Sequence, residues 1–323
     1  MRPLTLPAGR QATVDVPATT ANLGPGFDCL GLALDWTDRI HVETLDADGQ
    51  VVVEIEGEGS RQLPTDERNL IVRSLLTGLD RLGAAVVGLR VKVRNTIPQG
   101  RGLGSSSAAI VAGLAAAHAL ARRDEPFDPA EWLPSADQLE GHPDNVAAAL
   151  YGGLVLAFRS MAGGEVRAVP APVHPEIGGL VLVPDQPLAT EVARSVLPAV
   201  VPHQDAATNS GRAALLVHAL TAAPDLLFEA TADWLHQAYR GPSMPESFAL
   251  LTALRDDGLA AVVSGAGPTV LVLGRPADLD RADALVGRGA GDQACGGFRP
   301  VRVGVGDGVR ILAGTSGEAR DQL

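Results

Sequence analysis

The chain has 323 residues, 46% of them hydrophobic, which is enough apolar material for a large core organised in two lobes. Its net charge of −12 is spread along the chain and argues against nucleic acid as a partner, because a polyanion requires a basic surface. Met1–Gln11 lacks the apolar core of a signal peptide, the apolar stretches are too short to cross a bilayer, and Cys29 and Cys295 form no metal-ligand or disulfide pattern. We therefore expect a cytoplasmic protein that binds no membrane.

The first part of the chain is predicted to be mainly strands, because short apolar stretches alternate with glycine-rich turns. The segment Asn69–Leu82 is the exception: its apolar residues recur at helical spacing and stop at Gly83, which predicts an amphipathic helix. The other elements expected here are a strand at Ala12–Val16, a loop at Pro17–Asp28, apolar structure at Leu30–Leu34, strands at Ile40–Leu45 and Val51–Gly57, and a hairpin turn at 46–49.

The most distinctive segment is a loop rich in glycine and serine between a strand and a helix. Leu89, Val91 and Val93 alternate with charged residues, which is the period of a strand, whereas Ala108–Ala121 is long and rich in helix formers. Glycines let the loop approach a ligand closely, and the free N–H groups at the start of the helix favour an anion, above all a phosphate. The residues expected to bind it are Pro98, Gln99, Gly100, Arg101, Gly102, Leu103, Gly104, Ser105, Ser106, Ser107 and Ala108.

Spacing excludes the two best-known phosphate-binding loops. A P-loop requires Gly-Lys before Ser or Thr, and no lysine follows Gly104. A dinucleotide-binding fingerprint requires a third glycine at the position of Ser105. The remaining alternative is an ordinary strand-to-helix turn, although three glycines and three serines are more than such a turn requires.

The rest of the chain mixes helices and strands, and a shift in composition near Leu150–Leu156 predicts an approximate boundary between two lobes, 1–155 and 156–323. Prolines and polar residues predict an irregular segment at Asp124–Pro134. The expected elements are a short helix at Ser135–Glu140, a turn at His142–Asn145, a helix at Val146–Leu150, strands at Leu154–Phe158 and Leu180–Val183, a helix capped by Thr190 that ends before Pro198, helices at Asp205–Leu220, Leu226–Tyr239 and Pro245–Asp257, strands at Ala260–Val263 and Thr269–Leu273, a helix near Ala277–Gly287, and strands at Arg299–Val305 and Val309–Leu312.

Three glycine-rich loops occur in an order that is typical of one kinase family. Asn22–Asp28, Gly102–Ser107 and Gly265–Pro268 resemble the three motifs of the GHMP small-molecule kinases, and the resemblance runs from about Thr13 to about Leu273. It implies an α+β class and a two-lobe GHMP kinase fold, with an N-terminal lobe like domain 2 of ribosomal protein S5 and a ferredoxin-like C-terminal lobe that can share strands with it. It also implies ATP and Mg²⁺ as cofactors in a cleft between the lobes.

The first loop and the stretch Glu140–Asn145 resemble the members of this family that phosphorylate L-homoserine. The resemblance implies that Arg194 and Arg240 clamp the substrate carboxylate, for which a planar guanidinium is suited, and that Asp28 matches the ammonium. On the residues alone, a loop aspartate often bonds its own backbone, and an isolated arginine is usually a solvated surface residue. The residues expected to bind the substrate are Asn22, Asp28, His142, Asp144, Asn145, Thr190, Arg194, Arg240 and Gly267.

Metal binding and catalysis are expected to involve few side chains. Glu140 is the candidate Mg²⁺ ligand and Ser106 the candidate hydroxyl ligand, because Mg²⁺ prefers a carboxylate, a hydroxyl and waters; a surface acid at a helix end is the alternative for Glu140. Chemistry alone would allow His142 to carry a proton, whereas the resemblance makes it a substrate contact. An amide cannot accept the hydroxyl proton, so Asn145 would orient the hydroxyl, and Asp144 stays open as a base. The residues expected to be catalytic are Asp28, His142, Asn145 and Arg194.

Two other functions remain as alternatives. One is a GHMP kinase for another small alcohol, such as mevalonate or a sugar; a sugar would not require a carboxylate clamp, and mevalonate would not require Asp28 as an ammonium partner. The other is a regulator that binds ligand without turnover, which the presence of Glu140 and the serines disfavours. The sequence leaves the oligomeric state open, with a homodimer among the alternatives.

Overall fold

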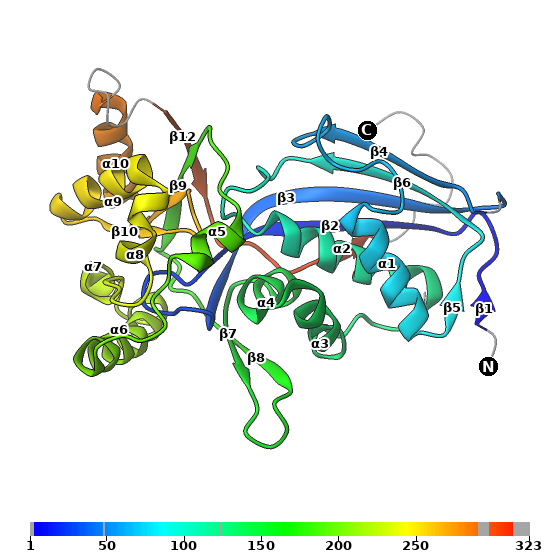
Figure 1. The fold of residues 1–323 in the computed structure, drawn as a ribbon, viewed down its shortest axis with the longest axis horizontal. Coiled ribbons are helices and arrows are strands. Elements are labelled where there is room, and N and C mark those ends of the chain that lie inside the picture. Colours follow the sequence, from blue (N-terminus) through cyan, green and yellow to red (C-terminus); the bar gives the residue numbers. More distant parts are fainter. Residues whose placement is uncertain (1–2, 48, 123, 290–296, 313–323) are drawn as a thin grey trace.

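Two long strands form the centre of a large sheet in the N-terminal part of the molecule (Figure 1). The structure, a computed structural model, describes residues 3–47, 49–122, 124–289 and 297–312. The two central strands, β2 (Gln11–Ala21) and β3 (Leu30–Leu45), pair antiparallel. Around them lie β13 (Arg310–Leu312) beside β2, β6 (Gly88–Asn95) beside β3, β4 (Val51–Gly57) beside β6, β7 (Leu154–Arg159) beside β3 and β8 (Val166–Ala171) beside β7; β1 (Leu4–Thr5) pairs separately with β5 (Ala84–Ala85).

Both central strands are longer than predicted. The prediction of a loop over Pro17–Asp28 is wrong for its first residues, because β2 continues to Ala21 and accommodates Pro17 at a shift of register against β3. The two separate segments Leu30–Leu34 and Ile40–Leu45 are one strand. Four of residues 35–39 between them are polar and three of the five are exposed, so the sequence shows no apolar continuity there, although the backbone of residues 37–39 pairs with β2.

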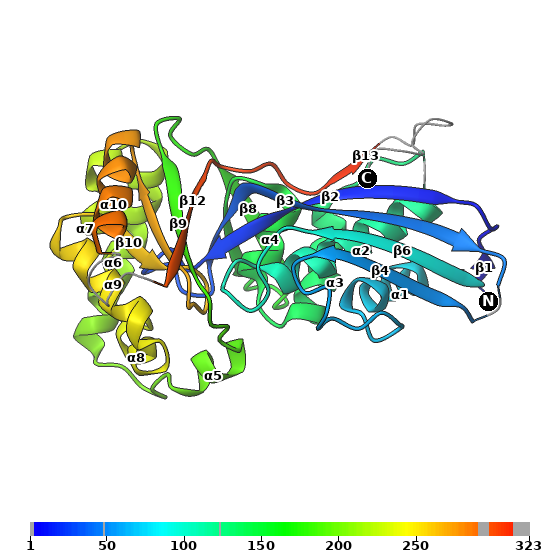
Figure 2. The same ribbon diagram turned by 90° about the horizontal axis from the view of Figure 1, so that it is seen from above.

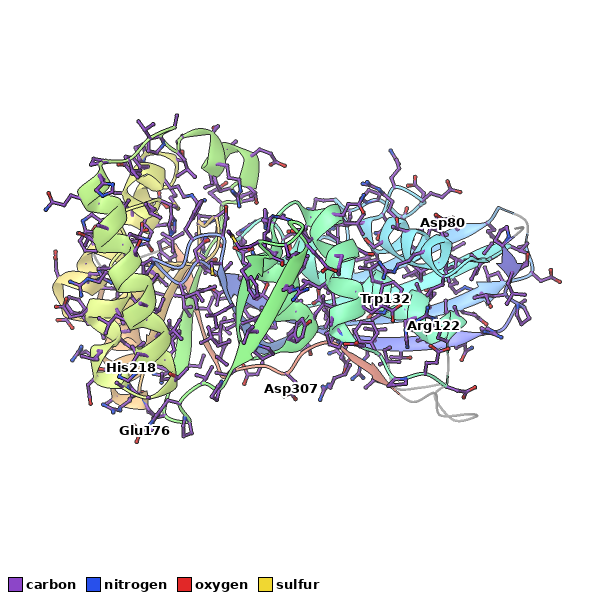
Figure 3. All side chains as sticks on the ribbon, turned by 90° about the horizontal axis from the view of Figure 1, so that it is seen from below. Asp80, Arg122, Trp132, Glu176, His218 and Asp307 are labelled. Atoms are coloured by element: carbon purple, nitrogen blue, oxygen red, sulfur yellow. The ribbon has the colours of Figure 1, made fainter. Side chains whose placement is uncertain are left out.

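Four helices cover one face of this sheet (Figure 1). Helix α2 (Ser105–Ala121) is buried on most sides, which explains why its sequence is apolar all round. The fully buried indole of Trp132 lies in this helical layer (Figure 3), and its ring stacks on that of Phe127. The other three helices are α1 (Leu70–Arg81), where the predicted helix lies and whose N-cap is Asn69, α3 (Pro129–Glu140) and α4 (Pro143–Tyr151).

Helices α3 and α4 begin earlier than predicted. The irregular segment expected up to Pro134 is already helical from Pro129, because Asp128 caps the helix by accepting a hydrogen bond from the Ala130 N–H (2.9 Å) and proline suits the first helical position. Pro134 lies inside α3. In the same way Pro143 starts α4, so Asp144 and Asn145 belong to its first turn rather than to a preceding loop.

The C-terminal part contains a second, four-stranded antiparallel sheet with its own apolar core. A helix follows the first strand and another follows the third, and the strand order β10-β11-β9-β12 is that of a ferredoxin-like lobe, as expected. The elements are β9 (Gly178–Pro184), α9 (Pro245–Asp256), β10 (Ala260–Val263), β11 (Val270–Gly274), α10 (Pro276–Gly289) and β12 (Phe298–Val303).

The segment between β9 and α9 is helical but more broken than predicted. A single helix over Leu226–Tyr239 is wrong, because the Asp233 carboxylate accepts hydrogen bonds from the N–H groups of Leu235 and Gln237 and so caps a new helix. Thr190 is not an N-cap: Ala189 accepts the first helical hydrogen bond, from the Ala193 N–H, and has the extended cap conformation. The elements here are α5 (Thr190–Ser195), α6 (His203–Thr221), α7 (Leu227–Ala230), α8 (Gln237–Arg240) and 3₁₀ turns at Pro224–Leu226 and Gly241–Ser243.

The end of the described chain returns from the second sheet to the first (Figure 2). Strand β7 spans the predicted boundary at 155/156 and β8 follows it, yet both belong to the first sheet. The division into 1–155 and 156–323 therefore stays a prediction, and we propose that the two lobes share strands. In the described part of the chain we find no helix that is both long and apolar enough to traverse a bilayer. Cys295 and residue 48 of the predicted turn lie outside the described residues.

Candidate functional site

A cavity of about 370 Å³ lies where the three glycine-rich loops meet. We call its two parts the nucleotide half and the substrate half. The nucleotide half is lined by the loop and helix start at Gln99–Ala109 and by apolar residues of the first sheet and α1, such as Ile40, Ile55 and Ile71. The substrate half is lined by polar residues, namely Asn22, His142, Asp144, Asn145, Thr190, Arg194, Arg240 and Gly265.

The glycine- and serine-rich loop presents backbone to the cavity. Gly104 has φ +67°, occupies the N-cap of α2, and offers no side chain to cap the helix. A Cβ added to Gly104 would lie 1.9 Å from Oγ1 of the buried Thr19, so only glycine fits. The N–H groups of the first turn of α2 therefore remain available for an anion at the positive end of the helix dipole.

Several predicted loop residues hold the loop in place instead of lining the cavity. The Arg101 side chain donates to the carbonyl oxygens of Pro184 (3.0 Å), Gln99 (2.6 Å) and Asp185, which fastens the loop to the end of β9. Leu103 is buried in the core. The Ser264 hydroxyl donates to the Gly102 carbonyl (2.6 Å) and thereby joins the second glycine-rich loop to the third. Pro98, Leu103, Arg101 and Ser107 do not line the cavity.

The structure brings together the two predicted metal ligands. Glu140 is the last residue of α3, and its Oε1 accepts hydrogen bonds from the hydroxyls of Ser106 (2.7 Å) and Ser107 (2.8 Å) at the start of α2. The described residues contain no group of three or more His, Cys, Asp or Glu that could hold a metal. One carboxylate and one hydroxyl suit Mg²⁺, which keeps several waters and is usually completed by phosphate oxygens.

The first turn of α4 forms a chain of hydrogen-bonded polar groups. His142 Nδ1 lies 3.2 Å from Asp144 Oδ1, and this contact raises the pKa of the imidazole above its usual value despite its partial burial. Asp144 is buried and also accepts from the backbone N–H of Asn145 (2.8 Å). Asn145 Oδ1 accepts from the Thr19 hydroxyl (2.8 Å), which orients the Asn145 amide so that its NH₂ group is the donor end.

Arg194 and Asp28, which are far apart in the sequence, form a bidentate ion pair. Nη2 and Nη1 of Arg194 donate to Oδ1 (2.6 Å) and Oδ2 (3.2 Å) of Asp28, and both side chains are about one-third exposed. Asp28 itself does not line the cavity, whereas Arg194 does. The hydrogen bonds to Asp28 raise the pKa of Arg194, so its guanidinium is charged at every physiological pH.

Arg240 is 1% exposed and is fixed by several contacts. Its Nε donates to the Ala193 carbonyl (3.2 Å) and its Nη1 to the Gly265 carbonyl (2.9 Å), and Nη1 lies 3.1 Å from Nδ1 of the buried His236. Desolvation, followed by the nearby charge of Arg194, lowers the pKa of Arg240 to about 10, so it still carries its charge at pH 7. Among the described residues, the hydrogen bonds of Arg240 are made by Nε and Nη1, which leaves Nη2 as a donor for a ligand in the cavity.

Phe27, which the sequence did not single out, and Asn22, a predicted substrate contact, complete the substrate half. The Phe27 ring lies under both guanidinium groups, 5.7 Å from that of Arg194 and 5.5 Å from that of Arg240. Asn22 donates to the Gly265 carbonyl (2.8 Å) and accepts from the Asp28 N–H (2.9 Å), so it ties the first loop to the third. Gly267 lies behind this layer, against Met244, and does not line the cavity.

Asp38 is a buried carboxylate at the floor of the nucleotide half. Its Oδ1 accepts hydrogen bonds from the N–H groups of Thr96 (2.5 Å) and Ile97 (3.0 Å), directly before the loop. Burial raises its pKa to about 6 in spite of these hydrogen bonds. A lone aspartate within a strand gives no sequence signal for this role, because the bonds join segments far apart in the chain.

Comparison with known proteins identifies the relatives of this chain. Residues 69–153 match the family model described as GHMP kinases N terminal domain, and residues 212–288 match the one described as GHMP kinases C terminal. The chain is 53% identical over 284 residues to a homoserine kinase of Streptomyces coelicolor, covering 87% of this chain and 91% of the relative. It is 47% identical to one of Mycolicibacterium vanbaalenii, covering 97% and 98% of the two chains.

A solved structure agrees with these sequence matches. The crystal structure of homoserine kinase from Cytophaga hutchinsonii superposes with a TM-score of 0.78 and 27% identity, covering 94% of this chain and 97% of the other. The similarity therefore includes both sheets.

Proposed function

This chain belongs to the GHMP kinase family, and from that premise we propose that its cavity transfers the γ-phosphoryl group of ATP to the side-chain hydroxyl of L-homoserine. The product is O-phospho-L-homoserine, and the reaction is a step of threonine biosynthesis. The observation that carries this proposal is that Arg194 and Arg240 line the same cavity as the anion-binding loop, and that the carboxylate of Asp28 is bonded to Arg194.

The charges of the substrate half suit an amino acid. Arg194 and the remaining Nη2 donor of Arg240 would hold the substrate carboxylate, and Asp28 would hold the ammonium. The Asn22 side chain supports Asp28 by accepting a hydrogen bond from the Asp28 backbone N–H. Thr190 lines the cavity, as Arg194 does. Gly267 would act indirectly, by backing the loop that carries Gly265.

Phosphoryl transfer requires positioning and charge stabilisation more than covalent chemistry by the protein. ATP is the phosphate donor, and the first turn of α2 would hold its phosphates through backbone N–H groups. Glu140 and Ser106 would hold Mg²⁺, which when bound neutralises charge on the β- and γ-phosphates. The Asn145 amide would donate toward the substrate hydroxyl, because Thr19 already occupies its oxygen.

The proton of the substrate hydroxyl has two possible acceptors: an oxygen of the transferred phosphoryl group, with no base in the protein, or the carboxylate of Asp144. Asp144 is the nearest carboxylate to Asn145, but its Oδ1 is already shared by His142 and the Asn145 backbone. We propose that His142 shapes the site as a substrate contact and that Asp144 holds it in position. A general base at Asp144 stays the alternative.

Location in the cytoplasm and assembly as a homodimer also stay proposals.

The test is a coupled assay of ADP release with homoserine, mevalonate, galactose, threonine and 1,4-butanediol. Two charged groups that each contribute roughly 1.5–3 kcal/mol should make kcat/KM for homoserine at least about a hundredfold higher than for the diol, which has neither. Turnover of the diol with the same kcat/KM would contradict recognition of an amino acid, although the protein could still be a kinase for another alcohol. Preference for mevalonate or galactose would favour another member of the family.

The metal proposal is tested in the same assay with Glu140→Ala. Loss of the carboxylate should reduce kcat by about a hundredfold or more at saturating Mg²⁺, because several kcal/mol of charge stabilisation is removed, while ATP still binds. Glu131→Ala is the matched control, since Glu131 lies in the same helix but pairs with Arg122 and does not line the cavity. Turnover near the wild-type level in Glu140→Ala would remove Glu140 from the metal site.

A further inference from the structure

The groups that would receive the two charges of the substrate are bonded to each other in this structure. Arg194 and Asp28 share two hydrogen bonds, of 2.6 and 3.2 Å, in the fork geometry that a guanidinium forms with any carboxylate. The substrate carboxylate and Asp28 therefore compete for the same face of Arg194. In the same way, the substrate ammonium and Arg194 compete for Asp28.

We propose that homoserine binds by ion-pair exchange, in which its carboxylate replaces Asp28 on Arg194 and its ammonium replaces Arg194 on Asp28. The proposal rests on the proposed function and adds to it a reason for specificity. A zwitterion supplies a partner to each half of the broken pair. A ligand with one charge supplies a partner to one half only and leaves the other half partly buried and unpaired.

The surroundings determine which group can move. Arg240 is fixed, because it is 1% exposed and bonded to Ala193, Gly265 and His236. The backbone of Asp28 is held by Asn22, with φ +53°. Arg194 is the adjustable partner, since it lies on the six-residue helix α5 and its side chain is 35% exposed. The exchange therefore requires a rotation of the Arg194 side chain and leaves the backbone of the loops unchanged.

The charges of the neighbours explain why a ligand with one charge is disfavoured. The guanidiniums of Arg194 and Arg240 lie 5.7 and 5.5 Å from the centroid of the same Phe27 ring, so two positive groups are close neighbours. Asp28 is the carboxylate that bonds one of them. An amine without a carboxylate would bind Asp28 in place of Arg194 and so leave both arginines without a bonded carboxylate. A hydroxy acid would bond Arg194 and leave Asp28 without a cation.

The experiment measures dissociation constants for homoserine, 4-hydroxybutanoate and 3-aminopropan-1-ol by calorimetry in the full-length wild type, Asp28→Asn and Arg194→Gln. In Asp28→Asn, homoserine should bind at least about tenfold more weakly, whereas 4-hydroxybutanoate should bind several-fold more tightly, because no internal carboxylate competes for Arg194. In Arg194→Gln, 3-aminopropan-1-ol should bind several-fold more tightly for the mirror-image reason. Asparagine tolerates the positive φ of position 28.

The control is Asp225→Asn, which breaks the ion pair of Asp225 with Arg275 outside the cavity and should change none of these constants. If neither ligand with one charge binds more tightly in its matching variant, exchange is wrong. ATP affinity, measured in each variant, shows that the nucleotide half is folded. If wild-type protein does not phosphorylate homoserine at all, the proposed function fails; if it does and the crossed pattern is missing, only the exchange fails.

Discussion

The groups expected to bind phosphate in the nucleotide half are backbone and small side chains of one short stretch, Gly100–Ala109, whereas those expected to bind the substrate are charged side chains from separate segments: Arg194 and Arg240 line the cavity, and Asp28 pairs with Arg194. In the first, Gly104 and the first turn of α2 offer N–H groups whose direction is set by the helix. In the second, Asp28, Arg194 and Arg240 depend on rotamers and on each other's charge. A backbone site should therefore be sensitive to added volume, and a side-chain site to changes of charge and shape.

Hydrogen bonds between the loops hold the two halves at a fixed separation. Asn145 contacts Thr19, against which Gly104 packs, and it also belongs to the turn that carries Asp144. Ser264 joins Gly102 to the third loop. The phosphate and the substrate hydroxyl would therefore be positioned by the same set of contacts, which is the main requirement of phosphoryl transfer.

The largest effect is expected at the nucleotide half, for Gly104→Ala. The new Cβ would lie 1.9 Å from the Thr19 hydroxyl and 3.2 Å from Asn145 Oδ1, and Thr19 is fully buried, so the loop must shift. A shifted loop no longer aims its N–H groups at the phosphates, and we expect ATP affinity to fall by about a hundredfold or more, measured by calorimetry.

Gly83→Ala is the matched control for the backbone strain alone. Gly83 has φ +64°, nearly the value of Gly104, but nothing lies within 4 Å of its added Cβ. This variant should lose about 1 kcal/mol of stability and keep its ATP affinity. Unchanged ATP affinity in Gly104→Ala would mean that the loop is only a turn and would end the comparison of the two halves.

The nucleotide half could be predicted from the sequence because its ligand groups are contiguous. A strand period, a glycine loop and a helix start within Leu89–Ala121 contain the information, and the structure places β6 and α2 there. The helix Asn69–Leu82 and the strand Val51–Gly57 were predictable for the same reason, since a local apolar pattern determines each. Local patterns failed where polar residues pair across the sheet, as in residues 35–39.

The substrate half could be predicted only through family resemblance. Nothing near Arg194 in the sequence indicates that it contacts Asp28, 166 residues away, or that Arg240 is buried. The break in the predicted helix Leu226–Tyr239 depends on a cap by Asp233, and that break positions His236 and Arg240. Such contacts arise from tertiary packing, which overrides local helix propensity. The roles assigned to these residues stay predictions.

A smaller effect is expected at the substrate half, for Arg194→Lys. Lysine keeps the positive charge but cannot form the two parallel hydrogen bonds of a guanidinium with a carboxylate. We expect KM for homoserine to rise by roughly tenfold to a hundredfold while KM for ATP stays near the wild-type value. A rise in both constants would show that the two halves are not independent, and an unchanged KM for homoserine would remove Arg194 from the carboxylate clamp.

The smallest effect on catalysis is expected for Asp38→Asn, because asparagine can still accept the hydrogen bonds from Thr96 and Ile97. What should change is the dependence of stability on pH. The native pKa of about 6 exceeds the usual 3.8, so between about pH 4 and pH 6 the folded protein binds more protons than the unfolded chain, and stability from this group decreases as pH rises through that window. Urea unfolding should show the wild type losing up to about 3 kcal/mol relative to Asp38→Asn between pH 4 and pH 7. The exposed Asp225, whose pKa is lowered by Arg275, serves as the control, since the wild type should not lose stability relative to Asp225→Asn as pH rises. If wild type and Asp38→Asn have parallel pH profiles, Asp38 is not buried as an ionised group at the floor of the nucleotide half.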